Sequence, residues 1–346
     1  MLPGRILLAA LALAVSLGGP ASAALRPPGT SRADHPAGHG SATPTTAGAL
    51  TLLSEPDDGV GPLYALLSSP RRSLDVELYE LRDPLAERLL AADARRGVRV
   101  RVLLDRHYLE ARNLPAYRYL STHGVAVRWA PAAFDLVHEK AFVVDGRVAT
   151  IMSLNLEREY YASTRDFAVV VRDPLDAAAV EAVFDADWAG RAGPAPAGTA
   201  LVWSPEDSQA ALLALIGGAR RSLLVENEEM EDPEIVAALV AAARRGVDVN
   251  VCMTDDLRWH AAFARLSAGG VHVRTYAPDA PLYIHAKALL ADVGLGDERG
   301  FVGSENFSVA SLRYNRELGI ELSAPALLRQ LATVLTADIS GARPWA

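Results

Sequence analysis

Short apolar runs alternate with longer amphipathic stretches over residues 50–340. Strand-like apolar runs flank one helical stretch in each half of the chain, at 74–78, 98–104, 223–226 and 247–253. The first helical stretch runs from Asp83 to Gly97 and the second from Asp232 to Gly246, and proline follows each aspartate. Aspartate is a natural N-cap, proline fits the first helical position, and glycine fits the left-handed position after the last turn. The pattern predicts strand–helix–strand units with parallel strands and right-handed crossovers.

The second helical stretch follows the first at an offset of 149 residues, which indicates a tandem repeat. We therefore predict two similar halves, at residues 49–195 and 196–346. The segment 189–200 contains two prolines and is the best boundary between them. The halves could be separate domains or one fused unit. The chemistry below favours fusion, because each half carries only half of an acid–base pair.

The N-terminal residues are typical of export. Arg5 precedes a short apolar stretch at 6–17, and the small residues 21–23 suit a cleavage site, so residues 1–23 are predicted to be a secretory signal peptide. Residues 24–48 are rich in Pro, Gly, Ser, Thr and Ala and are predicted to be a flexible leader. No later segment reaches the length of a membrane span without charges. We expect a secreted protein, extracellular or periplasmic.

Composition narrows the function only slightly. The chain has 346 residues, of which 50% are hydrophobic, so a sizeable core is expected. Its formal net charge of −8 argues mildly against a nucleic-acid partner, since such partners usually require a basic surface. The single cysteine, Cys252, excludes an intramolecular disulfide, and its apolar neighbours indicate a buried strand thiol.

Lysine occurs only twice, each time in the same pattern with histidine and aspartate. The two copies are His138, Lys140 and Asp145, and His285, Lys287 and Asp292. On a strand, side chains at i and i+2 share a face, so each histidine and its lysine point the same way. An ammonium is a compact point charge, which suits a site close to a reacting phosphate.

A second repeated pattern follows each histidine. Serine and asparagine come two residues apart, as Ser153 and Asn155 and as Ser304 and Asn306. Together with the lysines they would form a cradle for phosphoryl oxygens, and we predict these four residues to bind the substrate phosphate. An acid, Asp166 or Glu317, comes 11 residues after each asparagine and would fix a histidine tautomer. Metal binding is disfavoured, because a buried ammonium beside the histidine would repel a divalent cation.

With these residues the chain resembles the phospholipase D superfamily, over most of residues 50–340. The resemblance implies an α/β fold: two α/β/α sandwich halves, with mixed and largely parallel sheets, fused as a pseudo-twofold dimer. It implies that one histidine attacks phosphorus to give a phosphohistidine, while the other protonates the leaving alcohol and then activates water. His138 would be the nucleophile and His285 the acid–base, without metal or cofactor. Lysines and asparagines would stabilise the developing charge.

Two features depart from the family pattern. Met152 stands where the family usually has glycine, and it either narrows the first phosphate cradle or packs in the core. The second half has four extra residues, with 294–297 as candidates, which predict a longer hairpin loop.

Several candidates also have a simpler interpretation. Asp145 and Asp292 lie near glycines and suit turns as well as catalysis. Ser153 and Ser304 could cap local backbone instead of binding phosphate. The acidic run between Glu226 and Glu231 suits a solvated loop, but if it faces the cleft it would favour a cationic headgroup.

We hypothesise a phospholipase D-type phosphodiesterase that converts glycerophospholipid to phosphatidate and a free alcohol, with possible transfer to another alcohol. Its partners would be phospholipid and, transiently, a membrane surface, and the protein would be a monomer without an obligate protein partner. One alternative is a metal-independent nuclease acting on DNA or RNA. Another is a catalytically impaired lipid-binding effector. A cardiolipin-synthase-like activity is disfavoured, because the sequence shows no membrane anchor.

Overall fold

The computed structural model describes residues 45–191, 196 and 199–346. The predicted signal peptide (1–23) and most of the predicted leader (24–48) lie outside the described residues. The last part of that leader forms strand β1 (Thr45–Ala47), which pairs antiparallel with β2 (Leu50–Glu55).

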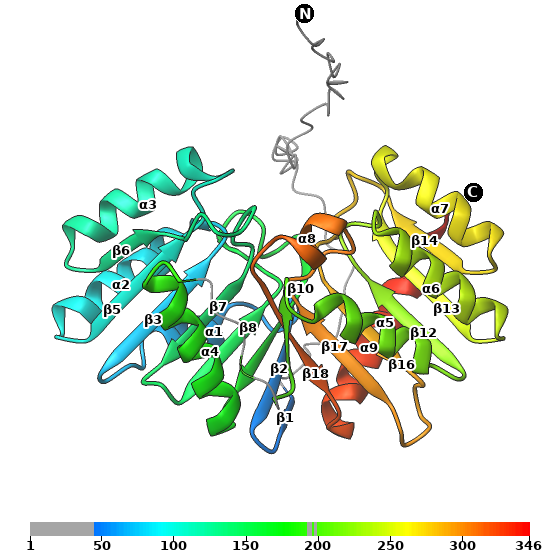
Figure 1. Ribbon diagram of the computed structural model, residues 1–346, viewed down its shortest axis with the longest axis horizontal. Coiled ribbons are helices and arrows are strands. Elements are labelled where there is room, and N and C mark those ends of the chain that lie inside the picture. The colour runs from blue at the N-terminus through cyan, green and yellow to red at the C-terminus, as the bar shows by residue number, and fades with distance from the viewer. Residues whose placement is uncertain (1–44, 192–195, 197–198) are drawn as a thin grey trace, which may run out of the picture. The chain divides into compact units, whose positions relative to one another are not determined.

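The first half is built on one sheet (Figure 1). In spatial order its strands are β1, β2, β10 (Thr164–Val171), β8 (Val148–Met152), β7 (Lys140–Val144), β3 (Ser73–Leu78), β5 (Arg99–Leu104) and β6 (Ala126–Trp129). Its helices are α1 (Gly61–Leu67), α2 (Pro84–Arg95), α3 (Glu110–Thr122) and α4 (Pro174–Trp188). A two-stranded sheet pairs β4 (Leu81–Arg82) with β9 (Leu156–Glu157).

The second half repeats this plan. In spatial order its strands are β11 (Leu201–Ser204), β18 (Glu317–Leu322), β17 (Arg299–Gly303), β16 (Ala288–Ala291), β12 (Ser222–Glu226), β13 (Asp248–Thr254), β14 (His272–Tyr276) and β19 (Arg343–Pro344). Its helices are α5 (Ser208–Gly218), α6 (Pro233–Arg244), η1 (Leu257–Trp259), α7 (His260–Ala268), α8 (Val309–Arg313) and α9 (Pro325–Gly341). The change of sheet falls between Trp188 and Leu201, the segment that holds the predicted boundary.

The repeated helices start and stop as their sequences predict. The Asp83 carboxylate accepts the Leu85 amide at 2.8 Å, and the Asp232 carboxylate accepts the amides of Glu234 and Ile235, both at 2.9 Å. After the helices, Gly97 and Gly246 have φ of 89° and 91°, in the left-handed region that glycine enters without a Cβ penalty.

The expectation of largely parallel sheets is wrong. Within each half, only β3–β5 and β5–β6 are parallel in the first sheet, and only β12–β13 and β13–β14 in the second. These are the strands joined through helices. In the first half, the strands that follow the histidine motif are joined without a crossover helix, by a short loop between β7 and β8 and by a segment containing β9 between β8 and β10, and both pairs are antiparallel. The α/β class with two similar halves is confirmed.

Hydrophobic packing gives each half two covered faces. In the first half, α1, α2 and α3 pack on one face of the sheet, and α4 packs on the other. In the second half, α5, α6 and α7 cover one face and α9 the other. The cluster that includes α4 and α9 contains residues of both sheets, so the halves share one core.

Strand pairing also links the halves. The short strand β15 (Tyr283–Ile284) of the second half pairs parallel with the start of β10 in the first half. Correspondingly, Val137 of the first half forms a parallel bridge with Arg316 of the second. In each half, the residues just before the histidine therefore pair through their backbone with residues of the other half.

Three smaller predictions can be compared with the structure. Cys252 is fully buried in β13, as predicted. The loop between β16 and β17 is longer than the equivalent loop between β7 and β8, also as predicted. Among the described residues no helix is long and apolar enough to cross a membrane.

Candidate active site

The two histidines lie just before β7 and β16; Lys140 is the first residue of β7, whereas Lys287 directly precedes β16. Strand β7 begins at Lys140 and β16 begins at Ala288, so His138 and His285 precede the strands rather than lying within them. His138 is 8% exposed, and the His285 side chain is 16% exposed. Both rings are thus largely shielded from water but reachable.

Each histidine pairs with the acid of the other half. Nδ1 of His138 lies 2.8 Å from Oε2 of Glu317, and Nδ1 of His285 lies 2.7 Å from Oδ1 of Asp166. A carboxylate at Nδ1 holds the proton there and leaves Nε2 free to react. The predicted partnership of histidine and acid is therefore present, and it crosses between the halves.

The backbone explains this crossing. The His138 amide donates to the Arg316 carbonyl at 2.9 Å, and the His285 amide donates to the Arg165 carbonyl at 3.2 Å. Arg316 directly precedes Glu317, and Arg165 directly precedes Asp166. In each case the histidine backbone and the imidazole ring are held by two consecutive residues of the other half. These contacts bring both motifs into one site.

The serines support the acids. The Ser153 hydroxyl donates to Asp166 at 2.6 Å, and the Ser304 hydroxyl donates to Glu317 at 2.7 Å. Both serines are fully buried, and each also accepts a backbone amide from the acid's strand. The prediction that Ser153 and Ser304 bind phosphate is corrected, because their hydroxyls already orient the carboxylates that hold the histidines.

The asparagines come after β8 and β17 and differ from each other. Asn155 donates its amide to Glu157 at 3.1 Å, whereas the Asn306 backbone amide donates to the Ser311 hydroxyl at 2.8 Å. Their side-chain oxygens are buried and have no hydrogen-bond partner in the described residues. Phosphate binding by Asn155 and Asn306 stays a prediction.

The two lysines are buried and anchored alike. Each ammonium donates at 2.5 Å to the carbonyl of its own histidine, Lys140 to His138 and Lys287 to His285. Burial, together with the charge of Lys287, lowers the pKa of Lys140 to about 7 against the opposing effect of Glu317. The charge of Lys287 thus affects the pKa of Lys140, as expected if both ammonium groups face one anion site.

Electrostatics favours a neutral His138. Burial lowers the pKa of His138 to about 4, and the nearby lysines outweigh part of the opposing effect of Glu317. Burial alone would raise the pKa of both acids, but the paired histidines pull the pKa of Glu317 and of Asp166 below its ordinary value. The site therefore combines ionised carboxylates with an unprotonated imidazole at His138.

Glu228 is a site residue that the sequence did not assign. Its carboxylate accepts hydrogen bonds from Lys287 at 3.0 Å and from the Tyr283 hydroxyl at 3.2 Å. Its Oε2 also lies 3.5 Å from Nε2 of His285. Burial opposes its ionisation, but Lys287 and His285 hold the pKa of Glu228 well below its usual range. The acidic run around it was the sequence signal, and this member of the run faces the histidine.

Arg165 and Arg316 were also missed. Arg165 forms a bidentate ion pair with Asp338, at 2.5 and 3.1 Å, and Arg316 forms one with Asp187, at 2.9 and 3.3 Å. Both ion pairs link the two halves, because Asp338 lies in α9 of the second half and Asp187 lies in α4 of the first. The signal was the repeated Arg-acid dipeptide, which lies within β10 in the first half and at the start of β18 in the second.

The structure does not bring Asp145 and Asp292 to the histidines, so their prediction as catalytic residues is wrong. Asp145 lies beyond the far end of β7 and accepts the backbone amides of residues 71–73. Asp292 does the same for residues 220–222. Both have positive φ, 55° and 59°, as turn residues do. Five extended residues separate Asp145 from Lys140, a distance of about 16 Å.

Met152 packs into the core of the first half and is fully buried there. It pairs with Ala168 across the sheet. At the equivalent Gly303, a Cβ would come within 2.6 Å of the Gly319 backbone, so that half has no room for a side chain. Of the two interpretations of Met152, the structure supports packing.

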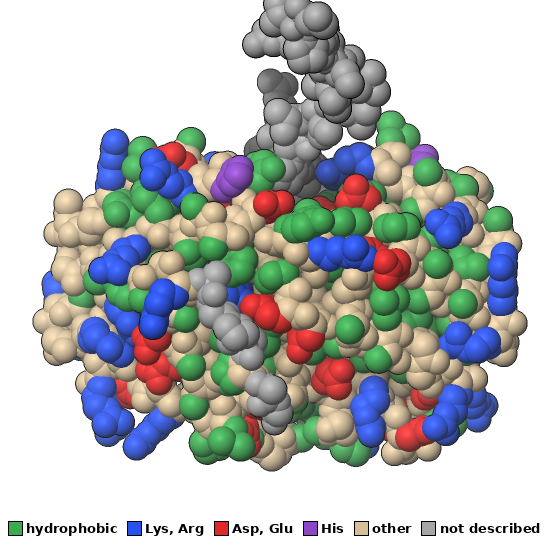
Figure 2. Space-filling view, viewed as in Figure 1, with side chains coloured by type: hydrophobic (Ala, Val, Ile, Leu, Met, Phe, Trp, Pro, Cys, Tyr) green, Lys and Arg blue, Asp and Glu red, His purple; other side chains and the backbone are tan. Residues whose placement is uncertain are grey.

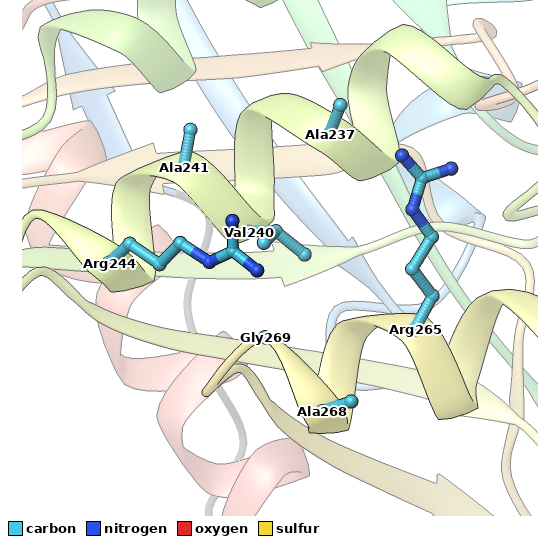
Figure 3. Close-up of a pocket in the computed structure, with 7 residues that line it drawn as sticks. All are labelled: Ala237, Val240, Ala241, Arg244, Arg265, Ala268 and Gly269. Atoms are coloured by element: carbon cyan, nitrogen blue, oxygen red, sulfur yellow. The ribbon is translucent and has the colours of Figure 1, made fainter.

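A cavity elsewhere does not belong to this site. A pocket of about 450 Å³ lies between α6 and α7 and is lined by small residues with Arg244 and Arg265 at its sides (Figure 3). None of the motif residues lines it. Within the described part of the chain, no group of three or more His, Cys, Asp or Glu side chains could hold a metal ion.

Comparison with known proteins identifies the family. The family described as "Cardiolipin synthase, PLD-like domain" matches residues 63–188 and 212–339, which is more than half of the chain. The chain belongs to the phospholipase D superfamily. The two matched segments correspond to the two halves of the fold, and the resemblance predicted from the motifs is confirmed.

One relative and two solved structures illustrate what the chain is similar to. Cardiolipin synthase A of Cronobacter sakazakii is 26% identical over 351 residues, covering 85% of this chain and 70% of that protein. Phosphatidylserine synthase of Haemophilus influenzae has a TM-score of 0.67 at 14% identity, covering 87% of this chain and 88% of that one. Polyphosphate kinase of Porphyromonas gingivalis has a TM-score of 0.68 at 16% identity, covering 84% and 47%. The structural similarities support the fold, and the family is one of phosphodiester-handling enzymes.

Proposed function

We propose that the protein cleaves the distal phosphodiester of a glycerophospholipid through a covalent phosphohistidine. The observation that carries this is the crossed pairing of each histidine with an acid of the other half, beside two buried lysines. Two imidazoles oriented through Nδ1 supply a nucleophile and an acid–base in one site. The lysines supply positive charge for the phosphoryl oxygens.

The histidines have different roles in this proposal. The pKa of His138, lowered to about 4, makes its Nε2 an unprotonated nucleophile at neutral pH. It attacks phosphorus as the phosphorus–oxygen bond to the alcohol breaks, and His285, flanked by Asp166 and Glu228, donates a proton to the departing oxygen. Water then attacks phosphorus and gives its proton to His285, and the phosphorus–nitrogen bond breaks. Free enzyme and phosphatidate result.

A second outcome of the same intermediate is transfer to an alcohol instead of water. The matched family and the relatives named cardiolipin synthase favour this candidate. A primary hydroxyl of a second lipid headgroup, or a free alcohol, would replace water and lose its proton to His285. Hydrolysis and transfer therefore share every residue and differ only in the acceptor.

Trapping the intermediate tests the chemistry. With a soluble p-nitrophenyl phosphodiester the leaving group needs no proton, so His285→Ala is expected to release a burst of p-nitrophenolate and to accumulate the remaining phosphoryl ester on Nε2 of His138. His138→Ala should give no burst. Mass spectrometry of peptides kept at alkaline pH locates the phosphate. Phosphate on His285 would reverse the assignment, and its absence in both variants would contradict the mechanism.

A lipid panel tests the substrate class. Phosphatidylglycerol, phosphatidylethanolamine and phosphatidylcholine are presented in mixed micelles with and without added glycerol, alongside single-stranded DNA in chelator. Phosphatidate alone supports hydrolysis, and a new phosphatidyl alcohol supports transfer. Cleavage of DNA with all lipids untouched would select the nuclease. On the face shown in Figure 2, basic and acidic side chains are interspersed and no continuous basic stripe is visible, which is unlike a nucleic-acid groove.

We also propose that the protein acts after export, supported by Arg5 and the apolar stretch 6–17 in the sequence. Cell fractionation and N-terminal sequencing of the mature chain test this. A start near residue 24 in an extracytoplasmic fraction is expected, and an intact N-terminus in the cytoplasm would contradict export.

A further inference from the structure

Two loops are tied to the residues that precede the histidines. We call residues 105–109 and 254–259 the rim loops. Oδ2 of Asp105 accepts the Val137 amide at 3.1 Å, and Oγ1 of Thr254 accepts the Ile284 amide at 2.8 Å. Val137 and Ile284 come directly before His138 and His285. The rim loops are thus held beside the site. The first follows β5, the second begins at the last residue of β13, and their tethering residues Asp105 and Thr254 are 149 residues apart, the offset of the repeat.

Each rim loop carries one large apolar side chain into solvent. Tyr108 is 47% exposed and Leu257 is 82% exposed, and both lie three residues after the tethering residue. The hydrophobic residues nearby turn inward, since Leu109 and Trp259 are buried. Single exposed hydrophobics are ordinary. These two, however, recur at one repeat position, and each lies on a loop that is hydrogen-bonded to the residue before a histidine.

Charged side chains at the rim loops have nearby partners. Arg106 pairs at 3.4 Å with Glu110, which directly follows the first loop, and Arg258 pairs with Asp256 at 2.7 Å. Oδ1 of Asp255 lies 2.7 Å from Nε2 of His260, which directly follows the second loop. An apolar tip flanked by paired charges suits the headgroup region of a zwitterionic bilayer better than a highly charged surface does.

We propose that the rim loops dock the protein on a phospholipid surface, with Tyr108 and Leu257 entering the interface on either side of the site. This rests on the proposed lipid substrate, and it adds the surface from which that substrate is taken. Docking through loops fixed beside the histidines places the site over the headgroups. The contact gains apolar burial at two points and needs no anionic lipid.

A local probe tests the contact directly. Because Cys252 is fully buried, an environment-sensitive dye can be placed selectively on Leu257→Cys or Tyr108→Cys in the full chain. Leu175→Cys is the matched control: Leu175 is 74% exposed and follows the far end of β10, away from Asp166 at its start. Phosphatidylcholine vesicles should shift the dye emission to the blue at 108 and 257 and leave it unchanged at 175. The shift should persist at high salt.

Activity measurements complete the test. Leu257→Ser and Tyr108→Ser should each lower the turnover of vesicle lipid about tenfold, while a soluble phosphodiester is hydrolysed as by the unmodified protein. Leu175→Ser should change neither. Equal dye shifts at all three positions, or no shift at 257, would overturn the docking surface. A shift without vesicles that grows with protein concentration would overturn it in favour of self-association. If the unmodified protein did not turn over vesicle lipid at all, the result would count against the proposed function rather than against the docking surface.

Discussion

Glu228 and Tyr79 occupy equivalent repeat positions, 149 residues apart, yet they surround the two lysines differently. The Tyr79 ring centre lies 5.0 Å from Nζ of Lys140, whereas Oε2 of Glu228 lies 3.0 Å from Nζ of Lys287. The second-half lysine thus already has an anionic partner. The halves of the site are related by sequence but not by charge.

Replacing this carboxylate is expected to strengthen anion binding. In Glu228→Gln the charge next to Lys287 is lost, so inorganic phosphate should inhibit about tenfold more tightly. Glu231→Gln, an exposed residue of the same loop, makes the same charge change and should leave inhibition unaltered. Inhibition constants measured with a soluble phosphodiester provide the comparison. Equal constants for both variants would show that Glu228 does not compete with phosphate.

The crossed histidine–acid pairs predict selective effects on the two rings. Glu317→Gln should move the Nδ1 proton resonance of His138 upfield and leave that of His285 in place, and Asp166→Asn should do the reverse. Both variants should lose about 10²- to 10⁴-fold in turnover, as when a histidine loses its orienting carboxylate. Proton NMR on histidine-labelled protein reads this directly. A same-half pattern of shifts would contradict the crossed arrangement.

Much of the site was predictable because its signals are local. Helix caps, the left-handed glycines and the i, i+2 spacing of His138 and Lys140 depend on the chain near each residue. The position of Asp145 was also implicit, since about 3.3 Å per extended residue carries it away from the histidine. Spacing along one strand therefore says which residues lie together and which do not. Spacing between the motifs says only which residues recur in the two halves.

The rest depends on how the halves meet. Nothing in the sequence around Asp166 says that its histidine partner is 119 residues away in the other half. The serines share the spacing of a phosphate cradle, yet tertiary packing turns their hydroxyls to the acids. In the sequence Glu228 is one member of an acidic run that suits a solvated loop, and only the fold brings Lys287, His285 and Tyr283 to its carboxylate.

The ion pairs between the halves are expected to carry stability. In Asp338→Asn the buried Arg165 guanidinium loses a bidentate carboxylate, which should lower the free energy of unfolding by about 3–5 kcal/mol. Asp297→Asn breaks the exposed pair with Arg220 and should cost less than about 0.5 kcal/mol. Urea denaturation of both variants measures the difference. Similar small losses would mean that the buried pair is dispensable.

Glu55 is expected to make stability depend on pH. It is 1% exposed, neither carboxyl oxygen has a partner in the described residues, and burial with nearby acids such as Asp166 raises its pKa from 4.5 to about 8. Between these values the folded protein holds a proton that the unfolded chain releases, so this contribution to stability is full below pH 4.5 and is lost as pH rises through 8.

The matching variant is Glu55→Gln, which cannot ionise. Its free energy of unfolding relative to the unmodified protein should rise between pH 5 and pH 8, by up to about 4 kcal/mol. Glu159→Gln, whose side chain is 50% exposed, should show no such trend. Denaturation series at several pH values give the slopes. If the free energy of unfolding depended on pH equally in Glu55→Gln and in the unmodified protein, Glu55 would not be the group with the raised pKa.

Asp145 offers a test of structure against chemistry within one motif. Asparagine tolerates the positive φ of 55° and keeps one side-chain oxygen, so Asp145→Asn should preserve the turn while weakening the bonds to the amides of residues 71–73. We expect about 1–2 kcal/mol less stability and turnover within about twofold of the unmodified protein. Asp166→Asn should behave oppositely, with turnover lost and stability less affected. If Asp145→Asn abolished turnover in a protein of normal stability, the aspartate of the motif would have to act on the histidine from the far end of its strand.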